Sequence, residues 1–295
     1  MQDKQACNVP VLTSDTAVMA VIGDPIRHSK SPLMHNAALA ACEWNGVYTA
    51  FHVLPERLGE AIAGMRALGI RGMNVTIPHK EHVIPFLDEI DDHARMIGAV
   101  NTIVNDKGRL IGYNTDGPGY VRSLIEETGI DLRATRVLLI GAGGAARGLA
   151  YALLHGGVKQ LIIANRTPER AERIVEELHM MGSIEAAALI DGMPQVDPEQ
   201  VDVIINTTSL GMHPHVDDMS IQASYIMPHM IISDIIYNPL ETKLLAAAQA
   251  AGARTHSGLG MFVYQGAIAF ELWTGKEAPV NVMREAVLHA MQEVK

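Results

Sequence analysis

Lys80 and Asp116 occupy sequence positions from which a lysine and an aspartate could together transfer a proton. Lys80 ends the run 74–80 (NVTIPHK), just beyond a predicted buried strand, and Asp116 closes the run 112–116 (GYNTD). A lysine can act as general acid or base, and a neighbouring aspartate would hold the lysine and a reacting hydroxyl in register. Each also has an ordinary structural interpretation, Lys80 as a solvated residue at a helix start and Asp116 as a helix N-cap.

Two further polar clusters occur at predicted strand ends or helix starts, where side chains can converge in a cleft. Ser29 and Ser31 flank the start of a predicted helix, so their hydroxyls and the nearby N–H groups can receive a carboxylate. Ser31 before Pro32 also fits an ordinary N-cap, and both interpretations can hold together. The cluster 98–102 (GAVNT) contributes Asn101. Together the clusters favour a site for a small hydroxylated acid.

A glycine loop between a strand and a helix predicts a dinucleotide-binding site. The strand 136–140 (RVLLI) is followed by GAGGAA (141–146) and then by a helical pattern. Gly141 permits a tight turn, Gly143 lets the backbone approach a pyrophosphate, and Ala146 lets the helix pack closely on the strand. The helix N-terminus adds unpaired N–H groups and a positive dipole end. The alternative is a connecting turn, but the strand before the loop and the helix after it favour the dinucleotide site.

The end of the next strand favours NADP (NADPH) over NAD. An NAD site usually places an acidic residue there, about 20 residues after the glycine loop, to bind the ribose 2′-hydroxyl. Here the strand 161–165 ends in Asn165, Arg166 and Thr167, and Arg170 follows one turn later. A guanidinium suits a 2′-phosphate through bidentate, charge-assisted bonds. The alternative is that the helix arginines only pair on an exposed face with the glutamates of the same helix, Glu169, Glu172, Glu176 and Glu177. That alternative fits Arg173 better than Arg166, which lies in the loop.

Strands alternate with helical patterns along most of the chain, which predicts right-handed βαβ units and an α/β fold class. The predicted strands are 17–23, 73–77, 136–140, 161–165, 201–206 and 230–236. The predicted helices are 31–46, 55–69, 168–179, 241–252, 261–273 and 279–294. The segments 99–104 and 109–114 flank the turn 105–108 and predict a hairpin. The second half, from residue 136, predicts a parallel sheet.

The composition is that of a globular protein with no general attraction for polyanions. The 295 residues are enough for two cores, and 23 Lys plus Arg against 33 Asp plus Glu give a formal charge of −10. An acidic chain has no field that draws it to nucleic acid or to an anionic membrane, so we expect neither partner.

Several absences point to a cytoplasmic protein without a metal. Cys7 and Cys42 cannot form a disulfide framework, the first fifteen residues lack the apolar run of a signal peptide, and no apolar stretch is long enough to span a membrane. The histidines near the polar clusters have no familiar metal-ligand spacing; they are His28, His35, His79 and His82.

Eight motifs of the chain resemble those of the shikimate dehydrogenase family and occur in the family's order. They are PIRHSKSPLMHN (25–36), NVTIPHK (74–80), GAVNTIV (98–104), GYNTDG (112–117), GAGGAA (141–146), NRT (165–167), DIIYNP (234–239) and GLGMFVYQGA (258–267). The likeness runs from about residue 17 to 275. It implies a substrate-binding domain of residues 1–115, completed by helices in 260–295, and a Rossmann-type NADP-binding domain of residues 116–259.

The resemblance also implies a role for individual residues. Lys80 and Asp116 look like the family's catalytic pair, with Lys80 relaying the hydroxyl proton while hydride passes between substrate C3 and nicotinamide C4. The implied substrate-binding residues are Ser29, Ser31, Thr76, Asn101, Tyr237 and Gln265. The implied cofactor-binding residues are Gly141, Ala142, Gly143, Gly144, Ala145, Asn165, Arg166, Thr167, Arg170, Ile235 and Gly258, with Asp92 a weaker match. The departures are an extension before Ala17 and the run 262–264 (FVY) before Gln265.

The implied activity is the reversible NADP-dependent reduction of 3-dehydroshikimate to shikimate in aromatic amino-acid (chorismate) biosynthesis, with a homodimer as a possible assembly. One alternative is a quinate/shikimate dehydrogenase with looser substrate and cofactor choice, which tends to carry an acidic residue after the second cofactor strand. Another is a non-catalytic NADP-binding regulator of the same fold, against which the presence of both Lys80 and Asp116 argues.

Overall fold

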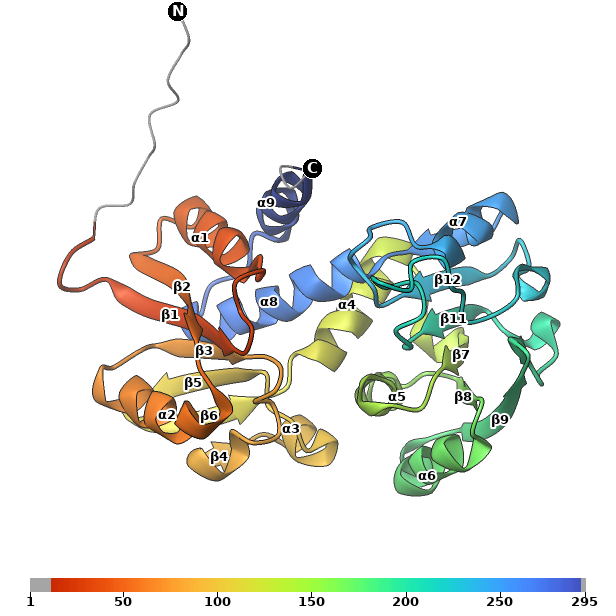
Figure 1. The fold of residues 1–295 in the computed structure, drawn as a ribbon, viewed down its shortest axis with the longest axis horizontal. Helices are drawn as coiled ribbons and strands as arrows, with labels where there is room; N and C mark the ends of the chain where they lie inside the picture. The colour runs from red at the N-terminus through yellow and green to blue at the C-terminus, as the bar shows by residue number, and fades with distance from the viewer. Residues whose placement is uncertain (1–11, 293–295) are drawn as a thin grey trace, which may run out of the picture. The chain divides into compact units, whose positions relative to one another are not determined.

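The computed structural model describes residues 12–292, and their contacts divide the chain into two compact α/β units (Figure 1). The first unit contains the chain up to Asp91, Ala99–Tyr113 and the chain from Ala269; the second contains Asp92–Gly98 and Asn114–Ile268. The predicted α/β class with two domains is confirmed. Cys7 and most of the segment tested for a signal peptide lie outside the described residues.

The first unit is built on a mixed sheet with the strand order β2-β1-β3-β5-β6-β4. The strands are β1 (Ala17–Gly23), β2 (Gly46–His52), β3 (Gly72–Val75), β4 (Glu89–Ile90), β5 (Thr102–Asp106) and β6 (Arg109–Tyr113). β1 pairs in parallel with β2 and β3, whereas β5 is antiparallel to both β3 and β6. The β5–β6 pair is the predicted hairpin, and its turn contains Lys107, with φ +52, and Gly108, with φ +95.

Three longer helices belong wholly to this unit: α1 (Ser31–Ala41), α2 (Leu58–Ala67) and α9 (Val280–Gln292). α1 lies beside α9 (Figure 1), where Lys30 Nζ donates to the Ala290 carbonyl at 3.1 Å. The prediction of a helix over 31–46 is wrong at its C-terminal end, because Gly46 already begins β2. Ser31 is the first helical residue rather than the N-cap, a position that Lys30 occupies without a side-chain bond that caps the helix.

The second unit is built on a sheet with the order β10-β9-β8-β7-β11-β12-β13, whose neighbouring strands β7, β8, β9, β11 and β12 are labelled in Figure 1. Its strands are β7 (Arg136–Ile140), β8 (Gln160–Asn165), β9 (Ile184–Ile190), β10 (Met193–Pro194), β11 (Val203–Asn206), β12 (Ile231–Asp234) and β13 (Arg254–His256). All neighbours are parallel except β9 and β10. From β9 to β13 this is the 3-2-1-4-5-6 order of doubly wound dinucleotide-binding folds.

Both faces of this sheet are covered, because alternate residues of its strands enter different cores. Val137 and Leu139 of β7 belong to one buried cluster, and Leu138 and Ile140 to the other. The covering helices are α4 (Asp116–Thr128), α5 (Gly144–His155), α6 (Pro168–Leu178) and α7 (Lys243–Ala250). The short α3 (Asp92–Ile97) also belongs to this unit.

The long helix α8 (Gly258–Thr274) contributes residues to both units. We expected residues from 260 onward to complete the first domain, but the contacts group residues up to Ile268 with the second unit. The reason is close packing on α4: a Cβ added at Gly119 would lie 2.5 Å from the Gln265 backbone nitrogen, and one at Gly260 only 1.9 Å from Ser123 Oγ.

No helix within residues 12–292 is both long enough and apolar enough to cross a membrane.

Candidate functional site

The glycine loop of the second unit has the geometry that a pyrophosphate needs. Gly141 has φ +108, a left-handed conformation that favours glycine, and a Cβ there would lie 2.8 Å from Thr207 Oγ1. A Cβ at Gly143 or Gly144 would meet nothing within 4 Å, so the backbone at the N-terminus of α5 borders open space. Ala146 is fully buried, as close packing of the helix requires. The loop can therefore offer its N–H groups to an anion.

The end of β8 lies next to this loop, because β7 and β8 are parallel neighbours and Ile140 pairs with Ala164. Asn165 Nδ2 donates to the Thr167 carbonyl at 2.8 Å, which shapes the turn, and the Arg166 and Arg170 side chains are exposed. Arg173 Nε contacts the Glu169 carbonyl at 3.3 Å. The ion pair that reaches α6 comes instead from Arg147, whose Nε lies 2.7 Å from Glu177 Oε2. This arrangement favours Arg166 and Arg170 as the phosphate-binding pair.

Ile235 and Gly258 lie in contact beyond the end of β12. A Cβ at Gly258 would lie 2.2 Å from the Ile235 carbonyl oxygen, so only glycine fits at this position without displacing the backbone. Asp92, the weaker cofactor match, begins α3 with an exposed side chain and pairs with Arg95 Nη1 at 2.9 Å. Its arrangement is that of an ordinary surface pair.

In the first unit, Thr76, Lys80 and Asn101 gather at the end of β3. Val75 N donates to the Asn101 carbonyl at 2.8 Å, and Val100 N donates to the Lys80 carbonyl, also at 2.8 Å. Asn101 lies here because β5, which it precedes, runs antiparallel to β3. These bonds fix the backbone on either side of the three side chains.

The loop that follows β1 and carries Ser29 and Ser31 begins at the same edge of the sheet, since the parallel strands β1 and β3 end there together. A Cβ at Gly23, the last residue of β1, would lie 2.5 Å from Thr76 Cγ2, and Asp24 N donates to the Ile77 carbonyl at 3.0 Å. Beyond this contact, Ser31 N donates to Ser29 Oγ at 3.3 Å, so the two serines lie side by side. Ser29 and Ser31 therefore follow the end of β1, and Thr76, Lys80 and Asn101 lie at the end of the neighbouring strand β3.

Asp116, Tyr237 and Gln265 belong to the second unit. Asp116 is the first residue of α4, where Asn114 Oδ1 accepts from its backbone N–H at 3.2 Å.

Tyr237 stacks on Phe262 with ring centroids 5.0 Å apart, and Gln265 Nε2 donates to the Phe262 carbonyl at 2.8 Å. Burial raises the pKa of the Tyr237 phenol. Phe262, which the sequence showed only as part of an unusual run, thus contacts two of the expected substrate residues. That Lys80 and Asp116 meet in one site remains a prediction.

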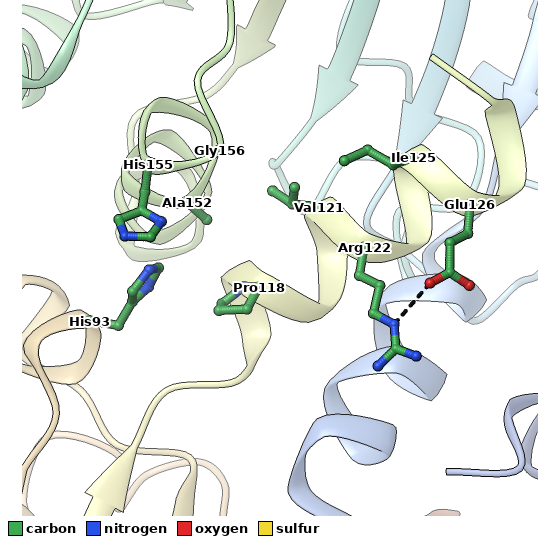
Figure 2. Close-up of a pocket in the computed structure, with 9 residues that line it drawn as sticks. All are labelled: His93, Pro118, Val121, Arg122, Ile125, Glu126, Ala152, His155 and Gly156. Atoms are coloured by element: carbon green, nitrogen blue, oxygen red, sulfur yellow. Dashed lines mark hydrogen bonds and ion pairs between the residues drawn. The ribbon is translucent and has the colours of Figure 1, made fainter. Parts of the chain in front are cut away.

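A pocket of about 410 Å³ lies elsewhere on the second unit, between α4 and the C-terminal end of α5 (Figure 2). Figure 2 shows the His93 and His155 rings next to each other, edge to face, at one end and the Arg122–Glu126 ion pair at the other. The pocket includes none of the expected site residues. The twelve residues of α5 place Gly144 roughly 16 Å from this end. The pocket is therefore not the dinucleotide site.

Within residues 12–292, no three His, Cys, Asp or Glu side chains come together as metal ligands would. His35 and His79, two of the histidines considered above, are buried. His79 uses Nε2 to contact the Val53 carbonyl at 2.8 Å.

Comparison with known proteins places the chain in a family. Family models match three segments: Shikimate dehydrogenase substrate binding domain at residues 21–103, Shikimate / quinate 5-dehydrogenase at 123–236, and Shikimate 5′-dehydrogenase C-terminal domain at 258–288. A Geobacillus kaustophilus protein named Shikimate dehydrogenase (NADP(+)) is 53% identical over 276 residues, which are 93% of this chain and 99% of that protein. The chain belongs to the shikimate dehydrogenase family.

Solved structures of shikimate dehydrogenases share the fold of this family member. A shikimate dehydrogenase in complex with NADP+ superimposes with a TM-score of 0.85 at 44% identity, covering 95% of this chain and 97% of that one. Shikimate 5-dehydrogenase from Listeria monocytogenes, in complex with shikimate and NAD, gives a TM-score of 0.88 at 37% identity, covering 95% and 99%.

Sequence reasoning missed a set of buried polar residues that leads to Asn101 in this shikimate dehydrogenase family member. Tyr48 and Thr102 are fully or almost fully buried, Asn74 is 7% exposed, and hydrogen bonds join the three in series. Asn74 and Thr102 fall within quoted motifs, but Tyr48 lies in a strand that the sequence pattern did not reveal. The local signal at Asn74 was a single polar residue inside the apolar strand GMNV.

Proposed function

We propose that the protein is an NADP-dependent shikimate dehydrogenase, which reversibly reduces 3-dehydroshikimate to shikimate for aromatic amino-acid biosynthesis in the cytoplasm. The observation that carries the proposal is the cluster at the end of β3, where backbone hydrogen bonds hold Lys80 beside Asn101 in the unit that contains the serine pair. This combination offers hydroxyls and amide groups for a carboxylate and ring hydroxyls, together with a lysine to handle a proton. A homodimer remains a prediction.

The glycine loop and the end of β8 fit NADP. The open backbone at Gly143 and Gly144 can hold the pyrophosphate, and the exposed guanidinium groups of Arg166 and Arg170 can hold the 2′-phosphate. Ile235 and Gly258, whose backbones pack closely together beyond the end of β12, would contact the nicotinamide ring. When bound, the nicotinamide supplies the hydride chemistry, and the chain supplies position and proton handling.

The substrate-side residues divide between binding and chemistry. Ser29 and Ser31 bind the carboxylate, and Thr76, Asn101, Tyr237 and Gln265 orient the ring. Lys80 Nζ then donates its proton to the substrate's C3 oxygen during reduction and accepts it during oxidation, with the Asp116 carboxylate holding the lysine and the hydroxyl in register. The related candidate is a quinate/shikimate dehydrogenase, because the family model that matches residues 123–236 covers both activities by its description.

The serine pair gives the first test of the proposal. Replacing both Ser29 and Ser31 with Ala should raise KM for shikimate by about 100-fold, since each substitution removes a hydrogen bond to the charged carboxylate of the substrate. KM for NADP should not change, because the serines belong to the first unit and the glycine loop to the second. Initial rates followed by NADPH absorbance measure both constants. Wild-type protein that oxidises quinate with the same kcat/KM as shikimate would favour the quinate/shikimate candidate.

Arg166 gives the second test. The native enzyme should prefer NADP to NAD, and Arg166→Ala should reduce that preference by about 10- to 150-fold, the equivalent of a charge-assisted contact to phosphate of about 1.5–3 kcal/mol. The ratio of kcat/KM for the two cofactors measures this. Arg173→Ala is the matched control: its guanidinium contacts a carbonyl of its own helix, so the ratio should stay native. A native enzyme with equal efficiency on NAD would refute the NADP assignment.

A further inference from the structure

A series of buried hydrogen bonds runs across the sheet of the first unit and leads to Asn101. Tyr48 Oη lies 2.6 Å from Asn74 Oδ1, Asn74 Nδ2 lies 3.0 Å from Thr102 Oγ1, and Thr102 Oγ1 lies 3.0 Å from Asn101 Oδ1. We call Tyr48, Asn74 and Thr102 the Tyr48 relay. It ends on Asn101, a proposed substrate ligand.

Strand register explains why these side chains meet. Tyr48 pairs with Met19 of β1, and Asn74 pairs with Val21, two residues farther along the same strand. Residues separated by two lie on one face of a sheet, so Tyr48 and Asn74 share a face. Thr102 is the direct cross-strand partner of Asn74 and lies on that face as well.

The donors and acceptors fix the direction of the relay from Tyr48 to Thr102. Asn74 Nδ2 also donates to the Asn101 backbone carbonyl at 3.2 Å, and a carbonyl oxygen can only accept. The NH2 end of Asn74 must therefore face Asn101 and Thr102, which leaves its oxygen to accept from Tyr48. Thr102 Oγ1 accepts from Asn74 and donates its own hydrogen to the Asn101 side-chain oxygen. Reversing the Asn101 amide would place an NH2 group against that hydrogen.

The packing around Tyr48 preserves this arrangement. His35 of α1 stacks on the phenol ring with centroids 4.3 Å apart and planes 14° apart, and neither of its ring nitrogens has a hydrogen-bond partner. The imidazole therefore holds the ring without competing for its hydroxyl. Tyr48 Oη also interacts with the Ser31 hydroxyl, which brings a second proposed substrate ligand onto the same phenol.

We propose that the Tyr48 relay positions the Asn101 amide with its oxygen turned toward Thr102 and its NH2 group turned away, as a donor to an oxygen of the substrate ring. The inference rests on the proposed function, because it assigns Asn101 its part in binding a hydroxylated ring acid. Tyr48, Asn74 and Thr102 are positioning residues, since they act through Asn101. An amide held in this way selects an acceptor oxygen, either a keto group or a hydroxyl, at the ring position it faces.

Thr102 offers a matched pair of substitutions that separates hydrogen bonding from packing. Thr102→Val keeps the branched shape and removes the hydroxyl, whereas Thr102→Ser keeps the hydroxyl and removes the methyl group. We expect Thr102→Val to raise KM for shikimate about tenfold, with kcat and KM for NADP within about twofold of native. Thr102→Ser should leave KM for shikimate within about twofold of the native value. If KM instead follows the lost methyl group, or if both KM values and the melting temperature move together, the relay is only structural and the proposal fails.

Tyr48→Phe tests the other end of the relay and keeps the ring stacked on His35. Because the Ser31 hydroxyl also acts on Tyr48, the effect of Tyr48→Phe is best measured in the background of Thr102→Val. If Tyr48 and Thr102 act through one relay, the Tyr48→Phe/Thr102→Val double variant should have nearly the KM for shikimate of Thr102→Val alone. If the two substitutions act independently, their effects on KM multiply, and that result would overturn the proposal. Wild-type turnover of shikimate with NADP is measured in the same series. Its absence would refute the proposed function, whereas a native KM in Thr102→Val would refute only the relay.

Discussion

Lys80→Met should lower kcat for shikimate oxidation by about 10²- to 10⁴-fold, the loss expected when a general acid–base is removed. The effect should fall on turnover, because the serine pair and Asn101 still bind the substrate, so an interaction made in the transition state is lost without a matching loss of ground-state binding. The backbone should tolerate the change: the Lys80 carbonyl accepts from Val100 N whatever the side chain, and Met keeps an unbranched stem. Initial rates with NADP measure kcat, and calorimetric titration of shikimate into the variant measures binding.

Asp116→Asn is the partner substitution in this experiment. It keeps the shape of the side chain and removes the charge that would orient Lys80 and the hydroxyl, so kcat should fall as in the lysine variant. Asp116 is also the first residue of α4, where loss of a negative charge costs about 0.3–1 kcal/mol of stability. A role limited to the helix terminus would show this small loss of stability with a native kcat. Folded Lys80→Met protein that turns over near the native rate would show that another residue moves the proton.

The parts of the fold that the sequence predicted well are those held in short, local segments. The glycine loop depends on φ at Gly141 and on the helix that begins at Gly144, and both follow from neighbouring residues. The hairpin of β5 and β6 follows from its turn at Lys107 and Gly108 in the same way. In such segments the amino-acid types alone fix which backbone conformations are possible.

The Tyr48 relay could not be predicted, because its members are 26 and 28 residues apart and meet only through strand register. β2 itself escaped notice: its sequence, GVYTAFH, has apolar residues on both faces and follows a helix pattern that appeared to continue to Gly46. β9, IEAAALI, was missed for a related reason, since its alanines favour a helix and only pairing with β8 makes it a strand. Tertiary contacts decide such segments.

His35 should make the folded protein sensitive to acid. Burial lowers the pKa of its imidazole from 6.5 to about 3, so the folded protein keeps the ring neutral at pH values where the unfolded chain takes up a proton. The free energy of unfolding therefore falls as the pH drops below 6.5 and continues to fall until about pH 3. At roughly 1.4 kcal/mol per pH unit, His35 alone should remove about 2 kcal/mol of stability between pH 7.5 and pH 5.

His35→Leu isolates this contribution, because leucine cannot take up a proton and is close to histidine in size. Urea unfolding of both proteins at pH 7.5 and pH 5 gives two changes in the free energy of unfolding, and their difference cancels the carboxylates that titrate in both. The native protein should lose about 2 kcal/mol more than the variant, whatever the variant's stability at pH 7.5. The aromatic neighbours of His35, Tyr48 and Trp273, carry no charge in this pH range and cannot produce that difference. Equal losses in the two proteins would mean that the imidazole is protonated as readily in the folded core as in the unfolded chain.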